Sequence, residues 1–305
     1  MKNTTIKKLL SIFTSLIFGG IITLALTETV LENQYNKTKA LAKNFVLNDV
    51  NRKPYEPEEY NCSIPKITSL PPIESTAIIG HAYGSPSDHT GFLAPSVATF
   101  LELNKENLSR VIFTGDVFFQ PSLQKWNKLT QKYRSFFDIV VAPGNHDVDF
   151  GDNAKRDVFN LSFPKKNKLP YVINNNKSLL IIEDSTTNRW VIGKKVKELV
   201  NSSNQYQDIF LFRHHILVKE LFNSANVKPA SPHELLNIRE LLDLLNTKKN
   251  ITIISGDSGG YGQPRLTCIQ FENVTTIANG IFQVEGDSVL VLTKNGELFS
   301  IDLKN

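Results

Sequence analysis

The sequence predicts an α/β fold in one large globular domain. Short β-rich apolar runs such as Val111–Thr114 and Ile209–Phe212 alternate with segments whose apolar residues recur at helical spacing. Polar residues directly follow several of these runs, as expected of strands that deliver ligand-binding side chains at their C-terminal ends. Four later runs predict antiparallel strands that close a second sheet: Thr267–Phe271, Thr275–Ile277, Val289–Thr293 and Leu298–Leu303.

Length and composition narrow the class of protein. The chain has 305 residues, of which 41% are hydrophobic, and a net charge of +4. This length suits one large domain with an N-terminal extension rather than two domains joined by a linker. The lysines are scattered among asparagine and serine residues without forming a basic helix face, so the sequence predicts no nucleic-acid partner.

An apolar N-terminal segment predicts export. Lys2, Lys7 and Lys8 precede an uncharged run from Leu9 to Leu26, close to the ~20 residues that span a bilayer. Lysines on this side place the rest of the chain outside the cytoplasm, in the periplasm or the extracellular space. An uncleaved signal anchor, which holds the protein in the membrane through an N-terminal transmembrane helix, is favoured. Cleavage of a signal peptide near Ala25-Leu26-Thr27, which would release a secreted protein, stays open.

The expected domain boundaries follow from this segment. Residues 1–27 form the anchor or signal peptide, residues 28–72 form a polar stem broken by prolines, and residues 73–305 form the globular domain. Cys62 lies in the stem and Cys268 lies late in the domain. In an exported protein they could form a disulfide or remain two buried thiols, and the sequence leaves both alternatives open.

The first half of the domain contains three strands that end at candidate site residues. Ser75–Ile79 is followed by Gly80-His-Ala-Tyr-Gly84, Val111–Thr114 by Gly115-Asp116, and Val140–Ala142 by Pro143-Gly-Asn-His-Asp147. Helices are expected at Thr99–Asn107 and at Pro121–Phe137, where Trp126 is expected to pack in the core.

The second half repeats the pattern. Tyr171–Ile173 and Leu179–Ile182 predict a hairpin, and Glu183-Asp184-Ser185 at its end is expected to have a structural role. Ile209–Phe212 is followed by Arg213-His214-His215. A helix is expected at His233–Leu245, and the strand Ile251–Ile254 is followed by Gly256-Asp257-Ser258-Gly259.

Three of these strand ends, in this order, resemble the second, third and fourth motifs of the calcineurin-like metallophosphoesterases. They are Gly115-Asp116, Gly144-Asn-His-Asp147 and His214, and the resemblance covers about Ala77 to Ser258. It implies a four-layer αββα sandwich of two mixed sheets flanked by helices. It also implies metal-dependent hydrolysis of a phosphoester.

The first and fifth motifs depart from the family pattern. Asp-x-His is replaced by His81-Ala-Tyr83, and Gly-His-x-His by Gly256-Asp-Ser-Gly259. The resemblance therefore implies one metal site formed by Asp116, Asn145, His214 and Asp257, and an altered one formed by His81, Tyr83 and the shared Asp116. Alternatively, His81 and Tyr83 only hydrogen-bond their loop. We expect one or two ions of Mn, Fe or Zn rather than Mg, because Mg prefers oxygen ligands.

The resemblance also implies roles for the neighbouring residues. His146, oriented by Asp147, would protonate the leaving alkoxide. His215 and Arg213 are candidates for substrate binding, since a guanidinium can hold a phosphate with two hydrogen bonds, although Arg213 could equally form an ion pair. The loops Ser85–Ala94, Phe150–Lys168 and Tyr261–Arg265 would supply the walls of the pocket.

Two other functions compete with this interpretation. Gly256-Asp-Ser-Gly-Gly260 matches the nucleophile loop of chymotrypsin-like serine proteases, but the expected helices do not fit their all-β double barrel. The sequence therefore predicts a membrane-tethered metallophosphoesterase with an atypical metal site, acting on a phosphomonoester or phosphodiester of the cell envelope. The alternative is a non-catalytic module of the same fold that binds a phosphorylated glycan or a protein partner.

Overall fold

The computed structural model describes residues 62–85, 91–148, 153–164, 168–187, 189–224, 235–258, 266–283 and 285–303. The predicted anchor and most of the predicted stem lie outside these residues. No helix within the described ranges is both long and apolar enough to cross a membrane. The membrane anchor therefore stays a prediction from the sequence, as do the domain boundaries.

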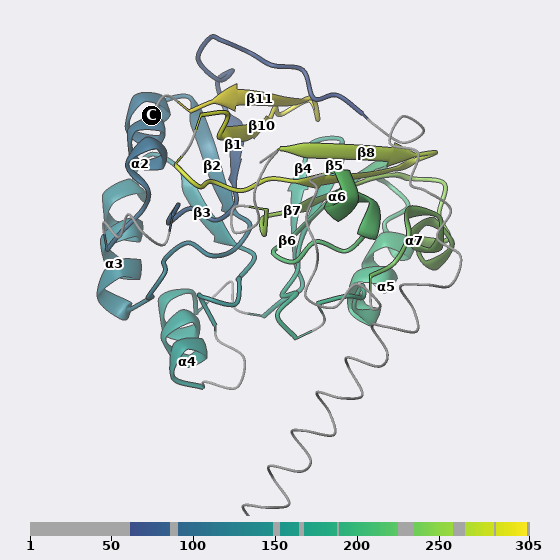
Figure 1. The fold of residues 1–305 in the computed structure, drawn as a ribbon, viewed down its shortest axis with the longest axis horizontal. Coiled ribbons are helices and arrows are strands. Elements are labelled where there is room, and N and C mark those ends of the chain that lie inside the picture. Colours follow the sequence, from purple (N-terminus) through teal and green to yellow (C-terminus); the bar gives the residue numbers. More distant parts are fainter. Residues whose placement is uncertain are drawn as a thin grey trace, which may run out of the picture. The chain divides into compact units, whose positions relative to one another are not determined.

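Two mixed sheets form the centre of the domain (Figure 1). The strands β1, β2 and β3 of the first sheet are parallel, β10 pairs antiparallel with β1, and β11 pairs antiparallel with β10. Its order is β11-β10-β1-β2-β3, with bounds β1 Ser75–Ile79, β2 Leu108–Phe113, β3 Asp138–Val141, β10 Ser288–Leu292 and β11 Leu298–Asp302.

The second sheet has a parallel centre formed by β5, β6, β7 and β9, with β4 and β8 as antiparallel edge strands. Its order is β4-β5-β6-β7-β9-β8, with bounds β4 Tyr171–Asn175, β5 Ser178–Ile182, β6 Asp208–Arg213, β7 Asn250–Ser255, β8 Thr267–Phe271 and β9 Val274–Ala278. The central strands are buried along nearly their whole length, as β1 and β5 show. Helices or the other sheet cover both faces, which explains their continuous apolar sequences.

Three apolar clusters define four layers. One lies between the sheets and includes Ile78, Ile112, Leu180 and Phe212. A second joins the first sheet to α2 (Pro95–Asn104), α3 (Leu123–Tyr133) and α4 (Asn153–Ser162). A third joins the second sheet to α5 (Lys194–Ser202), α6 (Lys219–Ser224) and α7 (Ile238–Leu245). The described residues thus form the expected αββα arrangement, with the two helix groups on opposite outer faces (Figure 1).

Local sequence explains where α3 begins. Ser122 caps α3 by accepting the N–H of Lys125 at 3.2 Å, and the apolar side of this helix buries Trp126, Leu129 and Tyr133. Trp126 packs edge-on against Phe118, with ring centroids 4.7 Å apart, so its predicted core role is confirmed.

Several sequence predictions of the fold were wrong. The strands β10 and β11 extend the first sheet rather than the second. The strands β8 and β9 join the second sheet as an antiparallel pair, as predicted, but β9 pairs parallel with β7 because the chain crosses to the outer strand β8 before it turns back. Part of the predicted loop Phe150–Lys168 is α4. The helix predicted from His233 begins at Ile238, where Asn237 and Glu240 form a capping box.

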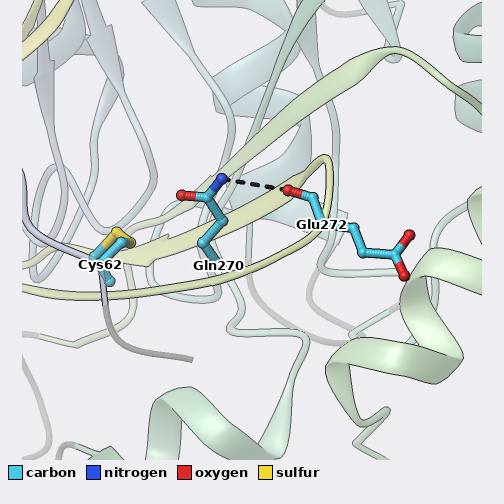
Figure 2. Close-up of a disulfide and its surroundings, with 4 residues drawn as sticks. Cys62, Gln270 and Glu272 are labelled. Atoms are coloured by element: carbon cyan, nitrogen blue, oxygen red, sulfur yellow. Dashed lines mark hydrogen bonds between the residues drawn. A yellow bond between two sulfur atoms is a disulfide. The ribbon is translucent and has the colours of Figure 1, made fainter. Parts of the chain in front are cut away.

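A short segment before β1 joins the outer strands of the two sheets. Cys62 is bonded to Cys268 on β8, which decides between the disulfide and the free thiols (Figure 2). Ile64 packs against the cluster between the sheets. Pro65 accepts the N–H of Ser300 on β11 at 2.8 Å, and Ile67 donates back to the carbonyl of Ser300 at 2.9 Å. We call residues 62–67 the clasp.

The hairpin that carries Cys268 has its own local support. Gln270 donates through Nε2 to the carbonyl of Glu272 at 3.3 Å, at the turn between β8 and β9 (Figure 2). Glu272 has a φ of 51°, in the left-handed region that tight turns use.

Candidate functional site

The C-terminal ends of strands from both sheets meet at the candidate site. His81 follows β1, Asp116 follows β2, Asn145 and His146 follow β3, and Asp257 follows β7. Backbone hydrogen bonds link these ends: the N–H of His81 donates to Gly115 at 3.0 Å. The N–H of Asp257 donates to the carbonyl of His214, after β6, also at 3.0 Å. The predicted convergence of polar residues at strand ends is therefore present.

Two glycines allow the strand ends to approach this closely. Gly115 has a φ of 88°, and a Cβ at this position would lie 2.4 Å from Nδ1 of His214. A Cβ on Gly144 would lie 2.2 Å from Oδ1 of Asp116. Side chains at either position would displace a candidate metal ligand, which gives a physical reason for the glycines in both motifs.

His214 is the centre of a group of hydrogen-bond acceptors. Its Nδ1 lies 3.0 Å from the carbonyl oxygen of Thr114, so Nδ1 carries the proton. In the neutral ring, Nε2 then offers a lone pair. That lone pair faces Oδ1 of Asn145 at 3.2 Å and one carboxylate oxygen each of Asp116 and Asp257 at 3.5 Å.

Such a group of acceptors repels itself unless a positive charge lies among them. The pKa of His214 responds to this environment: burial lowers it, but Asp116 and Asp257 outweigh burial and raise it above its usual value. A bound cation would satisfy the same atoms, and imidazole nitrogen with carboxylate and amide oxygens suits Zn, Mn or Fe. Side-chain atoms of His214, His215 and Asp257, of the types that bind metal ions, also lie within 4.8 Å of one another. The residues of the predicted intact site therefore fit a metal ion.

Asp116 stands between this group and His81. Its Oδ1 accepts the backbone N–H of His146 at 3.0 Å, and its Oδ2 lies 3.9 Å from Nε2 of His81. Burial alone would raise the pKa of the carboxyl, but the neighbouring imidazoles, His214 first, hold it below its usual value. Asp116 is thus an ionised, buried carboxylate whose Oδ1 is directed toward His214 and whose Oδ2 is directed toward His81.

His81 and Tyr83 form a tight aromatic pair with ring centroids 4.2 Å apart. His81 donates from Nδ1 to the carbonyl of Ile281 at 3.0 Å, and burial lowers its pKa to about 4. Burial, followed by the charge of Asp116, raises the pKa of Tyr83. His81 thus makes the loop hydrogen bond of the alternative interpretation and still directs Nε2 toward Asp116.

The expected contact between Asp147 and His146 is not formed, and this expectation was wrong. The carboxylate of Asp147 is fully buried and accepts three backbone N–H groups, those of Asp116 at 2.8 Å, Val117 at 3.0 Å and Gly144 at 3.0 Å. Nδ1 of His146 instead lies 3.1 Å from the carbonyl oxygen of Phe119, and the two rings stack with centroids 5.0 Å apart. Asp147 shapes the loops, and Phe119 orients the imidazole.

Arg213 does not reach a substrate, so its predicted role was also wrong. Its side chain is fully buried and pairs with Glu183 at 3.2 Å. It also donates from Nε to the carbonyl of His215 at 2.9 Å and from Nη2 to the carbonyl of Arg189 at 2.6 Å. The ion-pair alternative is therefore the one that the structure contains.

Ser185, for which the sequence predicted a structural role, orients His215 through hydrogen bonds. The Ser185 hydroxyl accepts the N–H groups of His214 and His215 at 3.1 Å each and lies 3.0 Å from Nδ1 of His215. With both lone pairs occupied, the hydroxyl donates its proton to Nδ1. The neutral ring then carries its proton on Nε2, which is buried and has no partner within the described part of the chain. His215 stays a candidate for substrate binding on sequence grounds, although its side chain is buried.

Other groups that organise the site were not found from the sequence. Ser185 follows β5 at the same rim, so its position was a usable signal. The carbonyls of Thr114 and Phe119 orient His214 and His146, and backbone groups leave no signal in the residue types.

The remaining sequence predictions fall into two groups. The layered α/β fold is incompatible with the double barrel of the protease alternative, and Ser258 is buried. The predicted wall Tyr261–Arg265 and Gly259 lie outside the described residues, as does part of Ser85–Ala94.

Comparison with family models and with curated proteins finds no match. Among solved structures, the chain is similar to a conserved uncharacterised protein of Streptococcus pneumoniae TIGR4, described as a predicted phosphoesterase. The identity is 10%, the TM-score is 0.29, and the similarity covers 76% of this chain and 98% of that chain. A TM-score this low carries no argument about the activity of this chain.

Proposed function

We propose that this chain is a metal-dependent phosphoester hydrolase with an atypical metal site, acting outside the cytoplasm. One observation carries the proposal. Nε2 of His214, unprotonated in the neutral ring, faces three acceptor oxygens within 3.5 Å. A cation among these atoms would remove their mutual repulsion, and the order of motifs along the chain resembles that of the metallophosphoesterases.

The ion would be held by Asp116, Asn145, His214 and Asp257. Bound there, it would polarise the phosphoryl oxygens and make a water molecule more acidic. The hydrogen bond from Nδ1 of His214 to Thr114 supports this arrangement, because it fixes the ring with Nε2 toward the oxygens. Imidazole coordination favours Mn, Fe or Zn over Mg.

His146 is the proposed general acid. Its Nδ1 donates to the carbonyl of Phe119, so the imidazolium form of the ring carries its second proton on Nε2, and this is the proton that it can transfer. As the phosphorus–oxygen bond breaks, the leaving alkoxide takes this proton and departs as an alcohol. Stacking on Phe119 holds the ring in one orientation during the transfer.

The cellular setting of the proposal rests on two features. The lysine-flanked apolar segment at the N-terminus predicts export, and the disulfide between Cys62 and Cys268 is typical of an oxidising compartment. We therefore propose a phosphomonoester or phosphodiester of the cell envelope as substrate, with the protein tethered to the membrane.

Purified full-length chain in detergent provides the test. Metal-free protein is supplied with Mn, Fe or Zn and assayed on p-nitrophenyl phosphate and bis-p-nitrophenyl phosphate. We expect turnover that depends on the ion. His146→Gln should keep the ion and lower kcat by roughly 10²- to 10⁴-fold. Asp116→Asn should lose both the ion and turnover, while Asp243→Asn, at an exposed position on α7, should change neither.

A non-catalytic binding module is the second candidate, and the altered first motif favours it. His81 and Tyr83 stand where the family places an aspartate and a histidine that bind metal. Absence of both bound ion and turnover with all three metals would overturn the hydrolase. Binding of a phosphorylated glycan or partner without turnover would then support the module.

A further inference from the structure

The two oxygens of the Asp116 carboxylate have different surroundings. Oδ1 faces His214 at 3.5 Å and accepts the N–H of His146 at 3.0 Å. Oδ2 faces Nε2 of His81 at 3.9 Å. In the family that the motifs resemble, this aspartate bridges two ions, so the difference bears on how many ions the chain binds.

The His214 side offers four ligand atoms of the right kinds. They are Nε2 of His214, Oδ1 of Asn145 and one oxygen each from Asp116 and Asp257, with three contacts of 3.2–3.5 Å to the single nitrogen. Four ligands are the usual number for a tetrahedral zinc site, and water molecules can complete larger coordination shells.

The His81 side of Asp116 offers fewer candidate metal ligands. Within the described ranges, its candidate ligands are Nε2 of His81, Oδ2 of Asp116 and the phenol of Tyr83. A phenol ordinarily keeps its proton at neutral pH, and in that form it is a weaker ligand than an imidazole or a carboxylate. The family's second histidine of the fifth motif is replaced by Gly259, which has no side chain.

The His81 ring is also fixed in place. Its backbone adopts a φ of 52°, its N–H donates to Gly115 at 3.0 Å, and Nδ1 donates to Ile281 at 3.0 Å. The residue is 2% exposed. A non-glycine residue held in the left-handed region by hydrogen bonds is costly to move, so the ring occupies space beside Oδ2 rather than swinging away from it.

We infer that this chain binds one metal ion, on the His214 side of Asp116, and that the His81 imidazole occupies the side where the related enzymes place a second ion. The inference rests on the proposed function, since it specifies the metal content of the same site. With one ion, the clamp that two ions place on the attacking and leaving oxygens is missing. Protonation of the leaving group by His146 then contributes a larger share of the rate acceleration.

Metal content and electron paramagnetic resonance test the inference without using activity. Metal-free full-length chain is incubated with excess Mn²⁺, freed of unbound ion and analysed for manganese per chain. We expect one ion per chain and the six-line spectrum of an isolated Mn²⁺. Two ions per chain with an exchange-coupled spectrum would overturn the inference and leave the proposed function standing, whereas no ion with Mn, Fe or Zn would overturn both.

Two variants assign the ion to one side. His81→Asn retains a side-chain amide that can donate to Ile281, and asparagine tolerates a positive φ. We expect it to keep one ion and the same spectrum. His214→Asn should lose the ion. A fall from two ions to one in His81→Asn, or retention of the ion in His214→Asn, would contradict the assignment. Circular dichroism of both variants verifies that each is folded.

Discussion

The carboxylate of Asp147 accepts the backbone N–H of Asp116 at 2.8 Å, so the loop after β3 holds the loop after β2 in place. The same carboxylate accepts the N–H groups of Val117 and Gly144 at 3.0 Å each. Both loops carry candidate metal ligands. A buried side chain that touches no substrate therefore determines where those ligands stand.

Replacing Asp147 should reduce stability strongly. In Asp147→Asn the amide can turn its oxygen toward some of the three N–H groups, but its NH2 group then faces another donor. Each unsatisfied buried group costs about 1–3 kcal/mol, so we expect the free energy of unfolding to fall by about 2–4 kcal/mol in denaturant titrations. Asp157→Asn on the exposed side of α4 should change it by less than about 0.5 kcal/mol. Equal effects of the two substitutions would contradict the anchoring role.

His81 should make the metal-free protein less stable in acid. Burial lowers its pKa from 6.5 to about 4, so between these values the unfolded chain binds more protons than the folded one. The free energy of unfolding therefore falls as the pH falls through this window, by about 3 kcal/mol in total from this group.

Comparison with His81→Asn isolates this contribution. Asp147, whose pKa is raised to about 7 by burial and by Asp116, acts in the opposite direction but is present in both proteins. Denaturant titrations at pH 7.5, 6 and 4.5 with a chelator should show a steeper loss in the wild type. Parallel profiles would show that His81 does not titrate in this way.

Gly115→Ala should displace the His214 ring. The added Cβ would lie 2.4 Å from Nδ1 of His214, at a φ of 88° that already disfavours alanine. Gly286→Ala is the matched control, because its φ is 91° and a Cβ there meets nothing within 4 Å. By calorimetric titration, we expect metal binding to weaken by at least tenfold in Gly115→Ala and to stay unchanged in Gly286→Ala. Weakening in both variants would mean that backbone strain, rather than the clash, is responsible.

Ser185→Ala should change the tautomer of His215 as well as stability. The N–H groups of His214 and His215 lose their acceptor, and Nδ1 of His215 loses its donor. We expect metal affinity to fall by about 10- to 100-fold, the usual effect of losing a group that orients a ligand. Nitrogen NMR of the imidazole should show protonation moving from Nε2 toward Nδ1, which a general loss of stability would not produce.

Two further variants support the interpretation of that experiment. Ser185→Thr keeps the hydroxyl and should restore most of the affinity and the original tautomer. Ser109→Ala, near the N-terminal end of β2 and so at the opposite end of the strand from the site, removes a hydroxyl that donates to the carbonyl of Glu74 at 2.9 Å and should leave both measurements unchanged. An unaltered His215 spectrum in Ser185→Ala would disprove the role assigned to the hydroxyl.

The sequence predicted most strands and helices well because their signals are local, whereas the four-layer arrangement came from the family resemblance. Apolar runs such as Ile209–Phe212 and the amphipathic pattern around Trp126 report burial directly. Pairing between strands far apart in the chain is not local. For this reason β10 and β11 were assigned to the wrong sheet, although each strand was expected near its observed position.

The same distinction explains the candidate site. The resemblance of the motifs at the strand ends implied that Asp116, Asn145, His214 and Asp257 lie together, and the structure brings the polar atoms of the other three within 3.5 Å of Nε2 of His214. The hydrogen-bond and ion-pair partners of individual side chains could not be predicted from the sequence. Arg213 pairs with Glu183, from a different strand end, and spacing along the chain contains no signal for such a pair.

The clasp has a mechanical consequence. A pull on the chain from its N-terminal side enters the domain at Cys62, and the covalent bond to Cys268 transmits the load to β8. The hydrogen bonds between the clasp and Ser300 then stay unloaded. After reduction the load would fall first on the hydrogen bond from the N–H of Cys62 to the carbonyl of Cys268 at 3.3 Å and then on the bonds to Ser300, which can open one after another. In a reducing environment, a pulling force could therefore separate the clasp from β11, whereas the intact disulfide holds it in place.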